Sequence, residues 1–252
     1  MKPLPDTLRT GPLDELRRRY PWPEVRPYAN LKDWSLDGGG KELVLDVIAH
    51  KGISLMVEVG AFVGGSAKVW LKANPGLTLI AIDPWAGDWW VNYAKQNGKD
   101  RLAEVFAGQD GPFKAFTSLV WNFRDRVIAM RGSSPGTIEE LHALGIRPQL
   151  FFFDSNKSGE ELELCSRLFP SAALTGDDRT WSLNGEFPIR KAVTAFAARH
   201  GLSYQSLMAT WVLWWEPLSA KLQLRWARRS LRHGLITLWH ALARVGLRIL
   251  GR

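Results

Sequence analysis

The stretch from Met56 to Ser66, MVEVGAFVGGS, constrains the fold of this chain more than any other. Apolar residues from 53 to 59 predict a buried strand, which runs into a glycine-rich turn and then a helix over 66–73. Glu58 lies inside this strand, where a carboxylate is costly unless something needs it. A second strand, LTLIAID, ends in Asp83, 23 residues after Gly60. An acid at that position can accept hydrogen bonds from the two hydroxyls of a ribose.

Two classes of cofactor are bound by a turn of this kind. Dinucleotide-binding folds need G-x-G-x-x-G, but position 62 is Phe, so the middle glycine is missing. The pattern E-x-G-x-x-x-G resembles motif I of the class I S-adenosylmethionine-dependent methyltransferases. The resemblance implies that this loop faces the methionine end of the cofactor, that Asp83 holds the ribose, and that residues after the third strand contact adenine. The cofactor residues that it implies are Glu58, Gly60, Ala61, Phe62, Gly64, Gly65, Ser66, Asp83, Trp85, Ser133 and Ser134.

Strands and helices alternate along most of the chain, which predicts an α/β fold with a mainly parallel sheet and helices on both faces. The last two strands, 203–208 and 211–215, are separated by a short turn and must be antiparallel. The resemblance implies a Rossmann-like, seven-stranded methyltransferase sheet with a terminal antiparallel strand. We expect an N-terminal cap over 1–40, a catalytic domain over 41–217 and a helical tail over 218–252.

The segment 84–122 is longer than a βα connection needs and is therefore expected to be an insertion or lid. It carries several aromatic residues. They either cover the open edge of the core or form a stacking surface for adenine, a sugar or an aromatic acceptor. The aromatic residues are Trp85, Trp89, Trp90, Tyr93 and Trp121.

Three acids follow two neighbouring strands of the expected sheet. Asp154 ends the strand QLFFF, and Asp177 and Asp178 follow the strand AALT. Carboxylates that meet at the carboxyl end of a sheet suit Mg²⁺ or Mn²⁺, whereas loop acids that only cap the next segment are the alternative. The pattern also resembles the metal-dependent O-methyltransferases of the catechol, caffeoyl-CoA and macrocin types. That resemblance implies metal ligation by Asp154, Asp177 and Asp178, and a catalytic base at Lys157.

Departures from these families concern the base and the acceptor. The segment DPWAGD, residues 83–88, is similar to small methyltransferases of glycan and natural-product pathways, which usually have histidine where Lys157 stands. We therefore expect O-methyl transfer to a sugar or another polyhydroxyl acceptor, which includes lipid-linked glycans. The alternative is an inactive protein of the same fold that serves as a membrane-associated partner in an assembly.

Charge and cysteine content limit the partners. The net charge of +8 comes from the tail: eight of the 33 basic residues and none of the 25 acids follow Glu216. This distribution argues against a nucleic-acid groove across the fold and indicates a polyanionic surface that the tail contacts. The single cysteine, Cys165, suits a reducing compartment, and no signal peptide is apparent. We expect a cytoplasmic protein, which is either free or peripheral on the membrane, and a homo-oligomer is compatible with the sequence.

The tail has the pattern of an amphipathic helix. It is too charged to span a bilayer, but its cations and apolar stripe suit an anionic lipid surface. A helix packed on the protein's own core or on a second subunit is the alternative. The cationic side comprises His240, Arg244, Arg248 and Arg252, the apolar side includes Leu235, Leu238, Trp239, Leu242, Val245, Ile249 and Leu250, and Trp226 lies in the basic stretch 221–232 before them.

Overall fold

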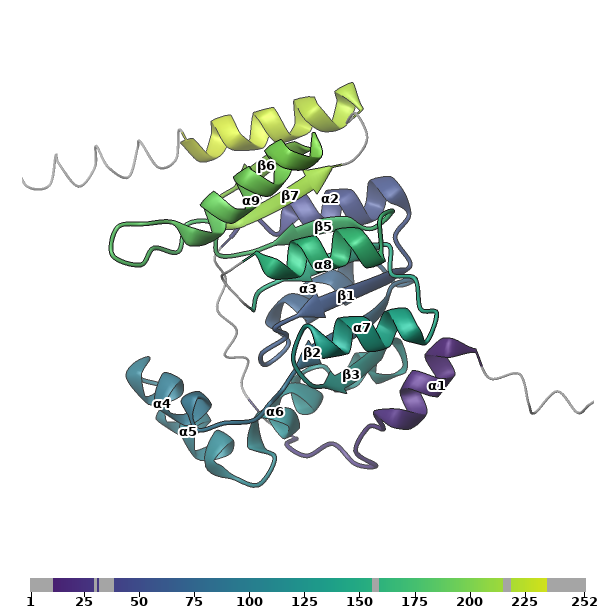
Figure 1. Ribbon diagram of the computed structural model, residues 1–252. Coiled ribbons are helices and arrows are strands. Elements are labelled where there is room, and N and C mark those ends of the chain that lie inside the picture. The colour runs from purple at the N-terminus through teal and green to yellow at the C-terminus, as the bar shows by residue number, and fades with distance from the viewer. Residues whose placement is uncertain (1–10, 30, 32–38, 156–158, 215–218, 235–252) are drawn as a thin grey trace, which may run out of the picture.

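A seven-stranded sheet forms the centre of the computed structural model, which describes residues 11–29, 31, 39–155, 159–214 and 219–234 (Figure 1). The strand order is β3-β2-β1-β4-β5-β7-β6. Strands β1 to β5 are parallel, and β7 runs antiparallel to both of its neighbours. This confirms the expected Rossmann-like methyltransferase sheet. The strands are β1 (Leu55–Val59), β2 (Thr78–Asp83), β3 (Val127–Arg131), β4 (Leu150–Phe153), β5 (Ala173–Gly176), β6 (Ser203–Leu207) and β7 (Thr210–Trp214).

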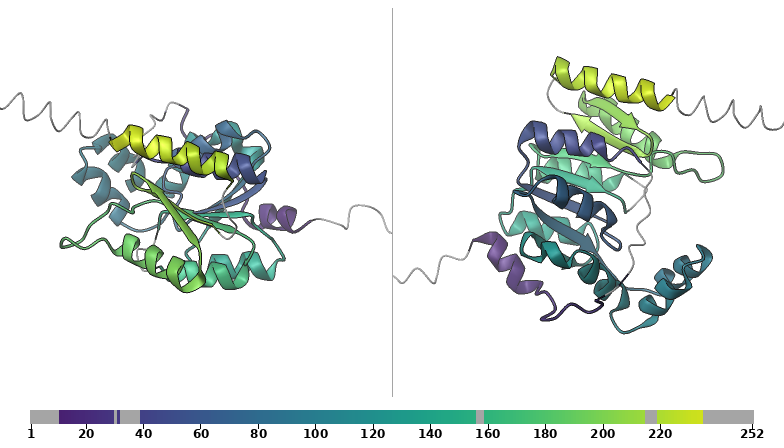
Figure 2. Two further views of the ribbon diagram at one scale, coloured as in Figure 1. Left: turned by 90° about the horizontal axis from the view of Figure 1, so that it is seen from above. Right: turned by 180° about the vertical axis from the view of Figure 1, so that it is seen from behind.

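Helices cover both faces of the sheet, as Figure 2 shows from above. One face carries α2 (Glu42–Lys51) and α3 (Gly65–Ala73), and the other carries α7 (Gly136–Ala143), α8 (Glu160–Leu168) and α9 (Pro188–His200). Successive side chains of a strand point to opposite faces. In β1, Met56 accordingly joins the core under α2 and α3, whereas Val57 joins the core under α7 to α9. Both faces of the strand are therefore buried, which explains its nearly continuous apolar sequence.

The chain between β2 and β3, which includes the segment expected to be an insertion, is made of helices. It contains α4 (Trp89–Gln96), α5 (Asp100–Ala107), α6 (Gly111–Leu119) and a 3₁₀ helix over Trp121–Arg126. The pair α4 and α5 extends beyond the edge of the sheet, whereas α6 lies next to it (Figures 1 and 2). The insertion thus forms a separate wall opposite the carboxyl ends of the strands.

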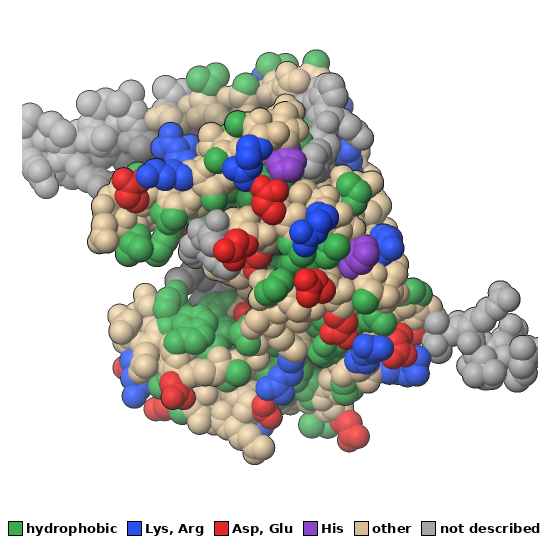
Figure 3. All heavy atoms as spheres, viewed as in Figure 1, with side chains coloured by type: hydrophobic (Ala, Val, Ile, Leu, Met, Phe, Trp, Pro, Cys, Tyr) green, Lys and Arg blue, Asp and Glu red, His purple; other side chains and the backbone are tan. Residues whose placement is uncertain are grey.

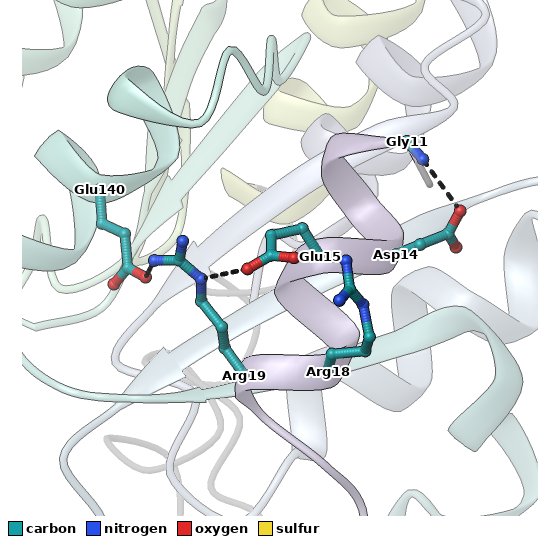
Figure 4. A network of polar contacts seen from close by, with 6 residues as sticks. All are labelled: Gly11, Asp14, Glu15, Arg18, Arg19 and Glu140. Carbon is teal, nitrogen blue, oxygen red and sulfur yellow. Dashed lines mark hydrogen bonds and ion pairs between the residues drawn. The ribbon is translucent and has the colours of Figure 1, made fainter. Parts of the chain in front are cut away.

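The described part of the N-terminal segment packs at the β3 edge of the sheet. Helix α1 (Pro12–Arg19) buries Leu16 completely. Figure 4 shows Arg19 between Glu15 of its own helix, at 2.9 Å, and Glu140 of α7, at 3.1 Å. The hydroxyl of Tyr20 donates a second hydrogen bond to Glu140, at 2.8 Å. These contacts fasten α1 to α7, and residues 32–38 of the expected cap lie outside the described residues.

The described part of the tail is a helix over 220–234, here called the tail helix, which packs on α2. Asp46 of α2 is 7% exposed and accepts hydrogen bonds from the Trp226 indole nitrogen at 2.9 Å, from Arg225 at 2.9 Å, and from Arg229. The Trp226 ring is 1% exposed and meets Trp214 of β7 edge to face. Trp226, which belongs to the basic stretch that was expected to contact a polyanionic surface, is therefore not available to that surface, because its indole completes the core and donates to a buried carboxylate.

Candidate functional site

A cavity of about 860 Å³ opens at the carboxyl ends of the central strands. It lies where the strand order reverses between β1 and β4, which is the position where open α/β sheets bind their ligands. Figure 3 shows a hollow between the body of the molecule and the insertion, with hydrophobic side chains gathered on the insertion side. The volume is that of a site for a cofactor or a drug-sized ligand. The lining combines the glycine turn, the tip of β2, the loops after β3, β4 and β5, and aromatic residues of α4.

The glycine turn has the close backbone approach that its sequence predicted. Gly60 has φ +89°, and a Cβ atom there would lie 2.3 Å from the carbonyl oxygen of Asp154, so only glycine fits. Gly60, Ala61, Phe62, Gly65 and Ser66 line the cavity, as expected. Gly64 does not line it, because side chains of the insertion pack against that glycine, whose left-handed conformation starts α3.

Asp83 is buried at the tip of β2 and faces the cavity. Its carboxylate accepts hydrogen bonds from the backbone nitrogens of Phe62, at 3.0 Å, and Trp85, at 2.8 Å. Burial raises the pKa of this carboxyl to about 6, although the two backbone donors act in the opposite direction. Each carboxylate oxygen retains a further lone pair, so the group can still accept hydrogen bonds from a ribose.

Trp85 lies behind the turn and does not line the cavity. Its indole nitrogen donates to the carbonyl oxygen of Phe62 at 2.8 Å, and its ring packs against Phe113 and Phe116 of α6. Trp85 and Phe62 both adopt positive φ angles, which residues other than glycine rarely do. The structure thus places Trp85 as a support of the cofactor turn and not as the cofactor contact expected from the sequence.

Glu58 is fully buried beneath the turn. One carboxylate oxygen accepts a hydrogen bond from the Ser66 hydroxyl, and the other has no hydrogen-bond partner among the described residues. Burial raises the pKa of Glu58 to about 7, while Ser66, the charge of Lys41 and the nearby Trp70 indole lower it. A buried carboxylate whose second oxygen has no partner is costly for folding, and such groups are concentrated at functional sites.

We expect Glu58→Gln to stabilise the ligand-free protein above neutral pH. Because the folded-state pKa of about 7 exceeds the ordinary 4.5, the folded state holds the proton longer, and stability falls as the pH rises from 4.5 to 7. The glutamine side chain has no proton to lose. The free energy of unfolding of Glu58→Gln at pH 8 should therefore exceed that of wild type by roughly 3 kcal/mol. Denaturant unfolding at pH 4 and pH 8 measures this, with exposed Glu139→Gln as the control. If the free energy of unfolding changed equally with pH in wild type, Glu58→Gln and Glu139→Gln, this prediction would be contradicted.

The loop after β3 meets a carboxylate that the sequence did not single out. Glu161 is 6% exposed, lines the cavity and accepts hydrogen bonds from the hydroxyls of Ser134 and Ser155, the latter at 2.8 Å. Ser133 and Ser134 also line the cavity. The position of Glu161 on the apolar side of α8, one turn before Cys165, was the available signal, since a carboxylate there must have a partner.

The three rim acids lie together at the cavity, but they do not fit a divalent ion. Asp154, Asp177 and Asp178 all line it. Within the described part of the chain, no group of three acid, histidine or cysteine side chains is arranged to hold a metal ion. The Asp177 carboxylate lies instead 3.7 Å from the Lys41 ammonium, and both side chains are about nine-tenths buried. The described residues thus do not show the magnesium site expected from the sequence, and Lys157 lies outside them.

An aromatic wall faces these acids across the cavity. Phe62 stacks on Trp90 with ring centroids 4.7 Å apart, and Trp90 packs on Trp89, which is 52% exposed. Burial, and then the charges of Asp154 and Asp178, raise the pKa of Tyr93. Trp89, Trp90 and Tyr93 line the cavity, which favours a ligand surface over simple cover for the core.

No protein-family model matches the chain, and no curated protein matches its sequence. Solved structures that resemble the chain include O-methyltransferases and also a precorrin-6y C5,15-methyltransferase from Geobacter metallireducens. A protein described as a caffeoyl-CoA O-methyltransferase, from Staphylococcus aureus, has a TM-score of 0.49 at 13% identity over 80% of this chain and 91% of that one. An O-methyltransferase from Bacillus cereus with S-adenosylhomocysteine has 0.47 at 17%, over 82% and 92%. TomG from Streptomyces achromogenes, involved in tomaymycin synthesis, was solved with S-adenosylmethionine and has 0.45 at 18%, over 79% and 85%. Similarity at this level transfers no substrate and no residue role to this chain.

Proposed function

We propose that this protein is an S-adenosylmethionine-dependent O-methyltransferase. The observation that carries the proposal is one cavity lined by the glycine turn, Asp83 and the rim acids together. The turn and Asp83 suit the methionyl and ribose parts of the cofactor, and the loop with Ser133 and Ser134 suits adenine. The acids Asp154 and Asp178 lie on the side where an acceptor hydroxyl would approach the sulfonium.

The chemistry that these residues support is an in-line displacement. When bound, S-adenosylmethionine would supply the methyl group that the acceptor oxygen takes up, and S-adenosylhomocysteine would be the product that leaves. The hydroxyl proton passes to the Asp154 carboxylate and from there to solvent. The protein contributes mainly by holding the two reactants in line and by excluding water.

The acceptor class follows from the two facing walls. The exposed face of Trp89 can stack on the C–H face of a sugar, while Asp154 and Asp178 can accept hydrogen bonds from neighbouring hydroxyls. These features support a sugar or another polyhydroxyl acceptor. An inactive protein of the same fold would have no need of a cavity in which both walls bear ligand-binding groups.

Calorimetric titration with S-adenosylmethionine, followed by methyl transfer to a panel of glycosides, polyols and catechols, tests the proposal. Asp154→Asn is expected to lower turnover at least 100-fold, because proton transfer from the acceptor is lost, and to leave cofactor affinity within about threefold of wild type. Asp125→Asn, on an exposed side chain outside the cavity lining, is the matched control. Absence of cofactor binding by wild type would refute the proposal, and full turnover by Asp154→Asn would refute the role of this acid.

We also propose that the outer side of the tail helix contacts anionic lipid. Its exposed side chains include Leu224 and Leu231, which are 54% and 69% exposed, and the cations Lys221, Arg228 and Arg232. This combination suits a membrane surface and would bring the cavity to lipid-linked acceptors. No helix among the described residues has the length and apolar character needed to cross a bilayer. The expected amphipathic continuation over 235–252 lies outside the described residues.

Vesicle co-sedimentation of the full-length protein tests this contact. Replacing Lys221, Arg228 and Arg232 by Glu should weaken binding to vesicles with anionic lipid at least tenfold, since each cation near the surface contributes about 1 kcal/mol. The charge-matched control replaces the exposed Lys72, Lys95 and Arg101 by Glu. Equal binding by both variants, or binding of wild type that is indifferent to lipid charge and salt, would contradict the proposal.

A further inference from the structure

A buried lysine at the start of α2 lies beside the site. Lys41 is 8% exposed and does not line the cavity. Its ammonium lies 3.7 Å from a carboxylate oxygen of Asp177, after β5, and its charge also acts on Glu58 in β1. Lys41 therefore interacts with two acids, Asp177 at the rim of the cavity and Glu58 beneath the glycine turn. A lysine is retained at such a buried position only where it pairs with negative charge.

The backbone before Lys41 is fixed against the far end of the sheet. Gly40 has φ +89°, and a Cβ atom there would lie 1.9 Å from the carbonyl oxygen of Leu207, at the turn between β6 and β7. The hydroxyl of the fully buried Thr210 donates to the carbonyl oxygen of Gly39 at 2.8 Å. The two glycines thus allow the chain to press on this turn, which sets where Lys41 enters the interior.

We propose that the Lys41 ammonium supplies the positive charge at the rim where the sequence led us to expect a divalent cation, and that this site works without one. The ammonium holds the Asp177 carboxylate as an ion pair and keeps it in place at the cavity. The Lys41 ammonium lies within 4 Å of one carboxylate oxygen of Asp177. A divalent ion bound to that carboxylate would therefore be repelled by the charge of Lys41. Lys41 is a positioning residue, because it acts on the cavity through Asp177.

Turnover without a divalent ion presupposes the proposed methyl transfer. The exclusion of the ion from Asp177 does not depend on that function. Mn²⁺ binding measured by electron paramagnetic resonance tests the exclusion directly. Wild type is expected to have no Mn²⁺ site that depends on Asp177, so wild type and Asp177→Asn should bind the same amount of Mn²⁺. Lys41→Met keeps the unbranched shape and most of the length of the side chain and removes its charge, so it should gain a Mn²⁺ site that Lys41→Met/Asp177→Asn lacks. Lys72→Met, on the exposed surface of α3, is the control and should behave as wild type.

The activity arm uses the same proteins. Wild-type turnover should be the same within twofold in EDTA and in millimolar Mg²⁺. Lys41→Met should lose at least tenfold in turnover and recover part of it with Mg²⁺, a response that general damage to the fold would not produce. Circular dichroism and thermal unfolding check that Lys41→Met is folded, and the wild-type measurements decide the matter if it is not.

Two results would overturn the inference. One is a wild-type Mn²⁺ site that Asp177→Asn abolishes, and the other is wild-type turnover that EDTA removes and Mg²⁺ restores. If no methyl transfer is found with any acceptor, the proposed function is in question while the Mn²⁺ measurements still decide the role of Lys41. The two failures are therefore distinguishable.

Discussion

Asp83→Ala is expected to weaken S-adenosylmethionine binding about 100-fold or more. The carboxylate would lose its hydrogen bonds to the two ribose hydroxyls, and each bond to a charged group contributes about 1.5–3 kcal/mol. The substitution also removes the acceptor that holds the backbone nitrogens of Phe62 and Trp85, so the cofactor turn loses an anchor. Isothermal titration calorimetry with S-adenosylmethionine and with S-adenosylhomocysteine measures the effect.

The control for this substitution is Asp88→Asn, because Asp88 lies in the same connection but is exposed and does not line the cavity. Its cofactor affinity should equal that of wild type. Asp83→Asn removes the charge and keeps only one of the two backbone hydrogen bonds, because its single amide oxygen can accept from Phe62 or from Trp85 but not from both. An unchanged dissociation constant in Asp83→Ala would mean that the ribose is held elsewhere.

Trp226→Ala is expected to lower the free energy of unfolding by about 3–5 kcal/mol, the usual cost of removing a fully buried large aromatic side chain. The loss combines the cavity left beside Trp214 with one of the three hydrogen bonds to the buried Asp46, which Arg225 and Arg229 still contact. Denaturant unfolding measures it. Leu224→Ala is the matched control, since this leucine lies on the same helix and is 54% exposed, and its effect should stay within about 0.5 kcal/mol.

A result in which Trp226→Ala is as stable as Leu224→Ala would mean that the tail helix does not pack on α2. The expected result has a practical consequence for lipid-binding assays. A chain that ends at 217 would lose Trp226 and the partners of Asp46, so its failure to bind vesicles would reflect damage to the fold. Substitutions on the outer side of the helix avoid this problem.

The sequence determined the sheet, the cofactor turn and the place of the acids at its rim. These features depend on patterns within single elements: apolar strands, a glycine turn before a helix, and acids directly after strands. Because parallel strands bring their carboxyl ends to one edge, the sequence also brought Asp83, Asp154, Asp177 and Asp178 to one cavity.

Only the tertiary structure decided which side chains pair at those positions. Asp177 pairs with Lys41 and Asp46 with Trp226, and the latter two residues are 180 positions apart in the chain. No local pattern relates such residues, since their contact depends on how α2 lies on the sheet and how the tail helix lies on α2. The same holds for Trp85, whose position near the turn predicted a cofactor contact but whose indole is held under the turn by α6. Sequence periodicity specifies which face of an element is buried, whereas the packing of distant elements specifies the partner that a buried charge or indole finds there.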